Sequence, residues 1–199
     1  MKKMDLRVIK TLKRIDESIV ELLREKSFED ITVKDICEHA MINRGTFYSH
    51  YKDKYDLIDS YQKELMIGVE DVLYRSKEVT QKEEEMKKIL EGLFVYIEDH
   101  KDKIFATAIA VGRLQFIEEF SKYTYKFYEA KQKEYGITIA QDNFRNYLIT
   151  YMSNAHIGII HRWLEGGCKE SPKEMANIVE KITVNGIFKS LLVNEELVI

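Results

Sequence analysis

The 199-residue chain contains one proline, Pro172, and nine glycines, so it has few of the residues that interrupt a helix. Leu, Ile, Glu, Lys and Tyr instead recur at three- and four-residue steps through long stretches, which is the spacing of amphipathic helices. This pattern predicts an all-α protein. The length is sufficient for one core, or for a small domain joined to a larger one.

Cysteines and long apolar runs are also scarce. Cys37 and Cys168 lie far apart and show neither a disulfide framework nor a repeated metal-ligand spacing, so we expect reduced thiols in a cytoplasmic protein. No stretch approaches the roughly 18 apolar residues of a membrane helix, and the lysine-rich N-terminus lacks the apolar run of a signal peptide. We therefore expect neither export nor a membrane partner.

Catalytic signatures are missing from the sequence. No acid–base pair, activated nucleophile or glycine-rich phosphate loop stands out, so we assign no catalytic residue and no cofactor. Cys37 and His39 would face nearly opposite sides of a helix, which argues against a metal site. His156 and His161 fit a core or an interface better than a ligand set. An enzyme is therefore the least favoured class.

The net formal charge of −3 argues weakly against a nucleic-acid partner. The charge is unevenly distributed, however, because positions 1–14 carry six basic residues against one acid, Asp5. A local basic segment can contact nucleic acid in a chain that is acidic overall. A solvated, lysine-rich helix end explains the same segment equally well.

The N-terminal part of the sequence predicts one long helix followed by two short ones. A single apolar stripe predicts the first helix over Asp5–Glu25. Thr32, with a carboxylate three residues later, marks the start of a second helix that ends near Ala40. Asn43 is a suitable cap for a third helix over Arg44–Tyr51. A fourth helix then restarts at Lys52 and Asp53.

The two short helices have the spacing of a helix-turn-helix, whose second helix lies in the major groove of DNA. Phe47 and Tyr51 are expected to face the first short helix. The outward face then carries hydrogen-bond donors and an exposed ring: Arg44, Gly45, Tyr48 and Ser49. Spacing alone does not decide the matter, because any three-helix unit contains two short helices and a turn.

A more specific signal lies in the segment Ile31–Ile58. Its run Phe47-Tyr-Ser-His-Tyr-Lys-Asp-Lys54, with Leu57 three residues on, resembles the DNA-binding domain of TetR-family transcriptional regulators. The resemblance extends over about Asp5–Tyr61. It implies DNA contacts at Thr32, Lys34, Arg44, Gly45, Thr46, Tyr48, His50 and Lys54. Among these, Lys54 and the free hydroxyl and amides of Thr32 are expected to contact phosphate.

The sequence departs from the family pattern at Met41, where the family usually has glycine. If Met41 takes the positive φ of that glycine, it stores strain. The resemblance also implies a helix-turn-helix domain over 1–52 and a larger helical effector-binding and dimerisation domain over 53–199. Within the latter, the segment Trp163–Ala176 looks like a subgroup described as dihydroxyacetone-kinase regulators.

Helices of the C-terminal part are predicted from Thr80 to Ile97, over Ile104–Val111, over Gly112–Lys131, from Asp142 or Asn143 to Leu164, and over Pro172–Val193. The last two are apolar around most of their circumference, so each must bury a second face beyond its own core. This predicts a homodimer with candidate contacts at Ile160, Trp163, Ile187 and Leu191. Candidate effector contacts, for most of which core packing is the alternative, are Phe94, Phe105, Arg113, Phe116, Tyr147 and Tyr151.

These features favour a ligand-responsive DNA-binding regulator, expected to be a repressor, that binds a pseudo-palindromic operator as a dimer. Its small-molecule effector is not identified by the sequence. The alternative is a helical adaptor or interaction protein without specific DNA binding.

Overall fold

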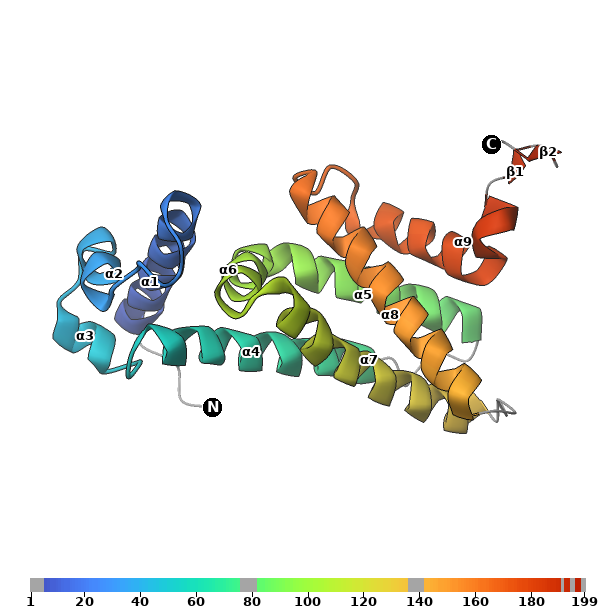
Figure 1. The fold of residues 1–199 in the computed structure, drawn as a ribbon, viewed down its shortest axis with the longest axis horizontal. Coiled ribbons are helices and arrows are strands. Elements are labelled where there is room, and N and C mark those ends of the chain that lie inside the picture. The colour runs from blue at the N-terminus through green and yellow to red at the C-terminus, as the bar shows by residue number, and fades with distance from the viewer. Residues whose placement is uncertain (1–5, 76–81, 136–141, 191, 194–195, 198–199) are drawn as a thin grey trace. The chain divides into compact units, whose positions relative to one another are not determined.

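The computed structural model describes residues 6–75, 82–135, 142–190, 192–193 and 196–197. Over these residues all regular secondary structure is helical except for a short antiparallel pair, β1 (Leu192–Val193) and β2 (Glu196–Leu197) (Figure 1). The helices are α1 (Leu6–Glu25), α2 (Val33–His39), α3 (Arg44–Tyr48), α4 (Lys54–Arg75), α5 (Lys82–Asp99), α6 (Lys101–Val111), α7 (Arg113–Tyr135), α8 (Asp142–Glu165) and α9 (Pro172–Ser190). The predicted all-α fold is confirmed.

Local capping explains where several helices begin. The side chain of Thr32 accepts a hydrogen bond from the amide of Asp35, and the Asp35 carboxylate accepts one from the amide of Thr32, which completes the predicted capping box of α2. The Asn43 side chain accepts from the amide of Gly45 at 2.8 Å and caps α3. Ser171 and Glu174 form the same reciprocal box at the start of α9.

Several helix ends differ from the prediction; α7, for example, ends at Tyr135, four residues after the predicted Lys131. α3 ends at Tyr48, three residues before the predicted end at Tyr51. α9 ends at Ser190 and contains Gly186 in a non-helical conformation with φ 72° and ψ 168°. A glycine accepts this positive φ without the steric cost that other residues pay, so the predicted regular helix to Val193 is interrupted there. The predicted cap of α5, Thr80, lies outside the described residues.

The chain forms two compact units, and the first contains the residues Met1–Leu65 and His100–Phe116. Its core takes apolar side chains from α1, α2, α3, the start of α4 and α6: Ile15, Ile19, Ile36, Phe47, Leu57 and Ala106. α6 therefore packs with the N-terminal helices, although it lies more than forty residues further along the sequence than Leu57. The functional boundary predicted after residue 52 stays a prediction.

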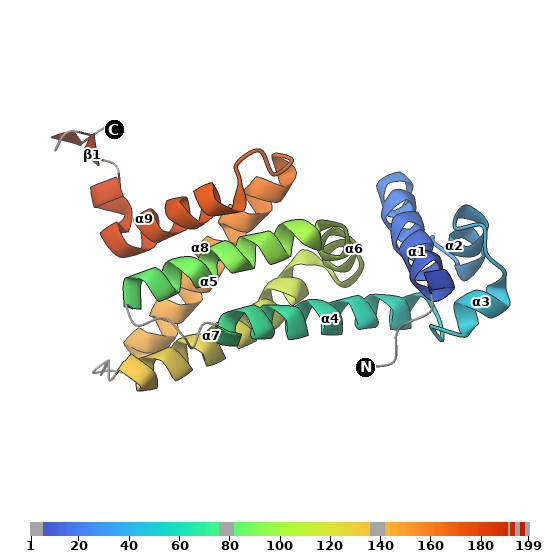
Figure 2. The same cartoon turned by 180° about the vertical axis from the view of Figure 1, so that it is seen from behind.

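The second unit contains Met66–Asp99 and Ile117–Ile199. α5 packs along α9, and Figure 2 shows the same pair from behind. Phe94 of α5 meets Trp163 of α8 edge-on, with ring centroids 5.3 Å apart, and both side chains are buried. These contacts form an apolar interior in unit 2. Among the described residues, no helix is long and apolar enough to cross a membrane.

Candidate DNA-binding site

The turn between α2 and α3 is a Schellman motif centred on Met41. The amide of Ile42 donates to the carbonyl of Cys37 at 3.0 Å, and the amide of Met41 donates to that of Glu38 at 3.2 Å. Met41 has φ 53°, and its side chain is 85% exposed. Met41 therefore takes the positive φ that the family's glycine usually has. A methionine holds the conformation that glycine adopts without strain.

The orientation of α3 follows from one buried ring. Phe47 is fully buried in the core of unit 1, and Tyr51 and Ile42 pack against that core. The opposite face is open, as predicted: Arg44, Gly45, Tyr48 and Ser49 are all exposed. Tyr48 lies edge-on to the Phe47 ring, with centroids 5.7 Å apart, and is 54% exposed. Its ring is thus oriented by the core while much of it remains accessible.

Gly45 has no structural reason to be glycine within the described residues. A Cβ atom built at this position would meet only the Oδ1 atom of Asn43 at 3.5 Å, which is an ordinary van der Waals distance. Glycine inside a helix nevertheless costs about 1 kcal/mol relative to alanine. The described residues therefore give no structural explanation for a glycine at this exposed position.

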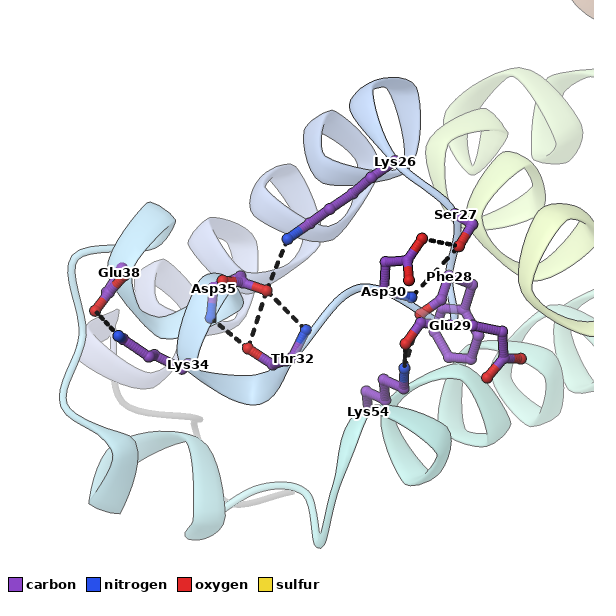
Figure 3. A network of polar contacts seen from close by, with 10 residues as sticks. All are labelled: Lys26, Ser27, Phe28, Glu29, Asp30, Thr32, Lys34, Asp35, Glu38 and Lys54. Atoms are coloured by element: carbon purple, nitrogen blue, oxygen red, sulfur yellow. Dashed lines mark hydrogen bonds and ion pairs between the residues drawn. The ribbon is translucent and has the colours of Figure 1, made fainter.

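The start of α2 is held by the polar network drawn in Figure 3. The Asp35 carboxylate accepts hydrogen bonds from the Lys26 ammonium at 2.7 Å and from the amide and hydroxyl of Thr32, each at 2.9 Å. These bonds hold the pKa of Asp35 well below its usual range, and the bond from Lys26 has the largest effect. The Thr32 hydroxyl was expected to be free, and this expectation is corrected: the capping box occupies it.

Lys54 also differs from the expected arrangement. Its ammonium donates to the backbone carbonyls of Phe28 at 2.7 Å and Glu29 at 2.8 Å, so it is turned towards its own chain (Figure 3). Lys34 is exposed and pairs across one helical turn with Glu38 at 3.8 Å. Thr46 and His50 are half-buried. The contacts of these residues with DNA stay predictions.

The six candidate effector residues are divided between the two units. Phe105 and Phe116 belong to unit 1, where the Arg24 guanidinium lies 5.9 Å from the centre of the Phe105 ring. Phe94 is buried in unit 2, whereas Tyr147 and Tyr151 of the same unit are exposed on α8. Arg113 belongs to α7, but its side chain is not among the described ones. Neither unit therefore contains all six candidate residues.

The structure describes the side chains of two of the four candidate dimer contacts, Ile160 and Trp163. Trp163 is only 3% exposed, and its indole nitrogen donates to the carbonyl of Glu170 at 2.9 Å. Its side chain is thus buried inside unit 2 of the single chain, and its contact with a partner stays a prediction. Ile160 is half-buried on α8. The Ile187 side chain and Leu191 lie outside the described residues. Exposed apolar side chains that the sequence did not single out lie at Phe144 and Ile178.

A short helix that exposes arginine, glycine and tyrosine, joined by a tight turn to a second short helix that braces it, is the geometry of the helix-turn-helix class of DNA-binding proteins. Residues 17–61 match the family described as "Bacterial regulatory proteins, tetR family", and residues 84–185 match a "Transcriptional regulator C-terminal region". The chain belongs to the TetR family of transcriptional regulators. Members of this family bind DNA, and most of them respond to a ligand. They are not enzymes.

Known proteins share either a segment of the sequence or the whole fold. A Bacillus subtilis protein named "Uncharacterized HTH-type transcriptional regulator YxbF" is 30% identical over 61 residues, which are 31% of this chain and 16% of that relative's length. The chain thus spans less than a fifth of this curated relative. The fatty acid degradation regulator FadR from Bacillus halodurans has a similar structure, with a TM-score of 0.68, 19% identity, and coverage of 94% of this chain and 98% of that one.

Two further structures are similar in fold. FadR from Bacillus subtilis in complex with stearoyl-CoA matches with a TM-score of 0.61 and 17% identity over 88% of this chain and 98% of that one. The dihydroxyacetone kinase operon activator DhaS matches with a TM-score of 0.57 and 15% identity over 88% and 94%. At such identities the likeness concerns the fold alone. It does not establish the dihydroxyacetone-kinase subgroup to which the C-terminal sequence is similar.

Proposed function

We propose that the protein is a repressor that binds a pseudo-palindromic operator as a homodimer and releases it when a small molecule binds to its C-terminal part. The observation that carries this proposal is the exposed face of α3. It combines an arginine, an oriented tyrosine ring and a glycine for which the described residues offer no internal reason. A DNA target on the host genome favours a cytoplasmic location.

Each residue of this face has a chemical role in the proposal. Arg44, at the first position of α3, reads a base edge, for which its guanidinium offers two parallel donors. Gly45 lets the DNA approach the helix backbone. Tyr48, one turn further along, reaches sugar and phosphate with its ring and hydroxyl. Thr46 and His50 flank this face. Lys34 adds a phosphate contact from the exposed side of α2.

The proposed dimer uses α8 and α9. Phe144, Tyr147 and Tyr151 recur at three- and four-residue steps on α8, so they share one face, and all three are exposed in the single chain. Ile178 adds an exposed apolar side chain on α9. An aromatic face of this kind is typical of a surface that is covered by a partner. Two-fold pairing would present two helix-turn-helix units to two operator half-sites.

The proposed effector is a small molecule that binds one arrangement of the two DNA-binding units better than the other, since only such a difference shifts the equilibrium. One structural neighbour, FadR from Bacillus subtilis, is in complex with stearoyl-CoA, which is therefore the first compound to test. Metabolites related to dihydroxyacetone are the second, because of the sequence similarity at Trp163–Ala176.

The test of DNA binding is to map the sites that the protein occupies on its host genome and to measure its affinity for the recovered duplex and for a scrambled one. The proposal expects a two-fold symmetric motif and much weaker binding to the scrambled duplex. Equal affinity for both duplexes, or no recovered motif, would favour the alternative of a helical adaptor. Arg44→Ala, checked for helix content by circular dichroism, is the control for binding through α3.

A further inference from the structure

The ammonium of Lys54 joins the first residue of α4 to the loop between α1 and α2. It donates to the carbonyls of Phe28 and Glu29 at 2.7 and 2.8 Å, and it lies 4.8 Å from the centre of the Phe28 ring and 5.2 Å from that of the Tyr55 ring. Two of its three donors are therefore used, and two ring faces stabilise its charge.

Neighbouring contacts reinforce the same connection. Phe28 is buried and meets Tyr55 edge-on, with centroids 5.4 Å apart. The Tyr55 hydroxyl donates to the Glu29 carboxylate at 3.2 Å, and this hydrogen bond raises the pKa of Tyr55. Two consecutive residues of α4 thus bind two consecutive residues of the loop. We refer to Phe28, Glu29, Lys54 and Tyr55 as the loop latch.

The latch flanks the helix-turn-helix: Phe28 and Glu29 lie before α2, and Lys54 and Tyr55 lie after α3. Its loop end is internally ordered, because the amide of Asp30 donates to the Ser27 carbonyl and that of Ile31 to the Phe28 carbonyl. Thr32, the cap of α2, follows Glu29 by three residues, and Lys26 before the loop pairs with Asp35 inside α2 (Figure 3). The position of the loop therefore affects the position of α2.

We propose that Lys54 is a positioning residue for DNA recognition: it fixes the α1–α2 loop against α4 and so sets the placement of α2 and of the α3 face that α2 braces. This inference rests on the proposed DNA-binding function, and it replaces the phosphate contact expected for Lys54. Here two backbone carbonyls hold the ammonium. A phosphate could use only the one donor that remains, unless it displaced the ammonium from the carbonyls.

The two roles predict different responses to salt and to local opening. Loss of a phosphate contact reduces the slope of log affinity against log salt by about one per subunit, and so by about two in a dimer. Loss of a positioning residue leaves the number of phosphate contacts unchanged, so the slope stays the same while affinity falls. The amides of the loop and of the first turn of α2 should also exchange with solvent faster, because the latch no longer restrains them.

The experiment compares Lys54→Met, which keeps the apolar stem, with Lys54→Arg, which keeps the charge, and with Tyr55→Phe, which removes one latch bond. Lys63→Met, at an exposed position further along α4, is the matched control. Hydrogen exchange of residues 26–35 and operator affinity at several salt concentrations are measured on the full chain, after circular dichroism has confirmed folding.

The expected result is a loss of operator affinity of at least about tenfold for Lys54→Met, as for the loss of charge-assisted hydrogen bonds, with an unchanged salt slope. Hydrogen exchange in residues 26–35 should be faster in Lys54→Met than in the parent protein. It should be closer to the parent rate in Lys54→Arg, and moderately faster than the parent rate in Tyr55→Phe. Lys63→Met should behave like the parent protein in both measurements.

Three results would overturn the inference. One is a salt slope that falls by about two in Lys54→Met with unchanged exchange, which would make Lys54 a phosphate contact. Another is a lower melting temperature with unchanged affinity, which would make the latch a contribution to overall stability alone. The third, which also decides the case if Lys54→Met does not fold, is unchanged exchange in Tyr55→Phe and Lys54→Arg. Failure of the parent protein to bind any DNA would refute the proposed function separately, since the exchange measurement needs no DNA.

Discussion

The hydroxyl of Tyr61, on α4, donates a hydrogen bond to the carboxylate of Asp16, on α1, inside unit 1. Lys103 of α6 pairs with the other carboxylate oxygen of Asp16 at 3.8 Å and with Glu64 at 2.6 Å, and it lies 5.2 Å from the centre of the Tyr61 ring. One polar cluster thus links three helices. Burial raises the pKa of Asp16, although Tyr61 and Lys103 act in the opposite direction.

This cluster predicts a specific dependence of stability on pH. Because the pKa of Asp16 is raised above its ordinary 3.8 in the folded state, the folded protein binds this proton more tightly than the unfolded chain. The contribution of Asp16 to the free energy of unfolding should therefore increase as pH falls from neutrality through the raised pKa, and level off below 3.8.

Asp16→Asn tests this contribution, since its amide oxygen can still accept from Tyr61 and it does not titrate. The free energy of unfolding of the parent protein minus that of the variant should rise as pH falls from about 7 to about 4. Urea unfolding at several pH values measures both. A difference that stays constant or declines over this range would contradict the raised pKa of Asp16.

A second prediction concerns the turn before α3. Met41→Gly should raise the free energy of unfolding by about 1 kcal/mol, because glycine adopts the left-handed conformation without strain. Because the Met41 side chain is exposed, its removal loses little packing. Thermal unfolding measures the change, and operator affinity should be nearly unaffected. Met41→Ala is the control: it keeps the strain and should give no comparable gain. A less stable glycine variant would mean that the Met41 side chain packs usefully.

Gly45 allows a third prediction, in which stability and binding move in opposite directions. Gly45→Ala should stabilise the folded chain by up to about 1 kcal/mol, because alanine is the better helix former and its Cβ has room. The same methyl group should weaken operator binding if DNA approaches the α3 backbone closely. Chemical unfolding and duplex titration of one protein preparation test both effects. Unchanged affinity would remove the functional explanation for this glycine.

The sequence predicts those features that depend on residues close together in the chain. The caps of α2, α3 and α9 each involve residues within three positions, and the structure has all of them. The outward face of α3 was also predictable, because one large apolar residue, Phe47, decides which side is buried.

Contacts between distant residues could not be predicted in this way. Lys54 was expected to be free because its carbonyl partners lie 25 and 26 residues earlier in the sequence. A helix that is apolar on every side indicates that two faces are buried, but not which residues face the chain's own core. Trp163 was therefore assigned to the dimer surface, although it packs against Phe94.

The dimer leads to a fourth prediction. Tyr147 and Tyr151 are 77% and 57% exposed in the single chain, so a charge at either position should be tolerated by the fold and should disrupt a partner contact. Tyr151→Glu should shift the protein from dimer to monomer at micromolar concentration and weaken operator binding. Ile67→Glu replaces an equally exposed apolar residue on α4 and should remain dimeric. Light scattering after size exclusion decides, and a monomeric parent protein would refute the dimer.

The last prediction separates the roles of Arg44 and Tyr48 on the exposed face of α3. If Arg44 hydrogen-bonds a base edge, Arg44→Ala should cost about 1 to 3 kcal/mol of operator binding and relax the preference at one position per half-site. Tyr48 contacts sugar and phosphate in the proposal, so Tyr48→Ala should weaken operator and scrambled duplex by the same factor. Its partial exposure predicts a folded variant. Affinities for a set of single-base operator variants, measured at constant salt, distinguish these patterns. If both variants retain the sequence preference and affinity of the parent protein, α3 has a structural role only, and the adaptor alternative takes the place of the regulator.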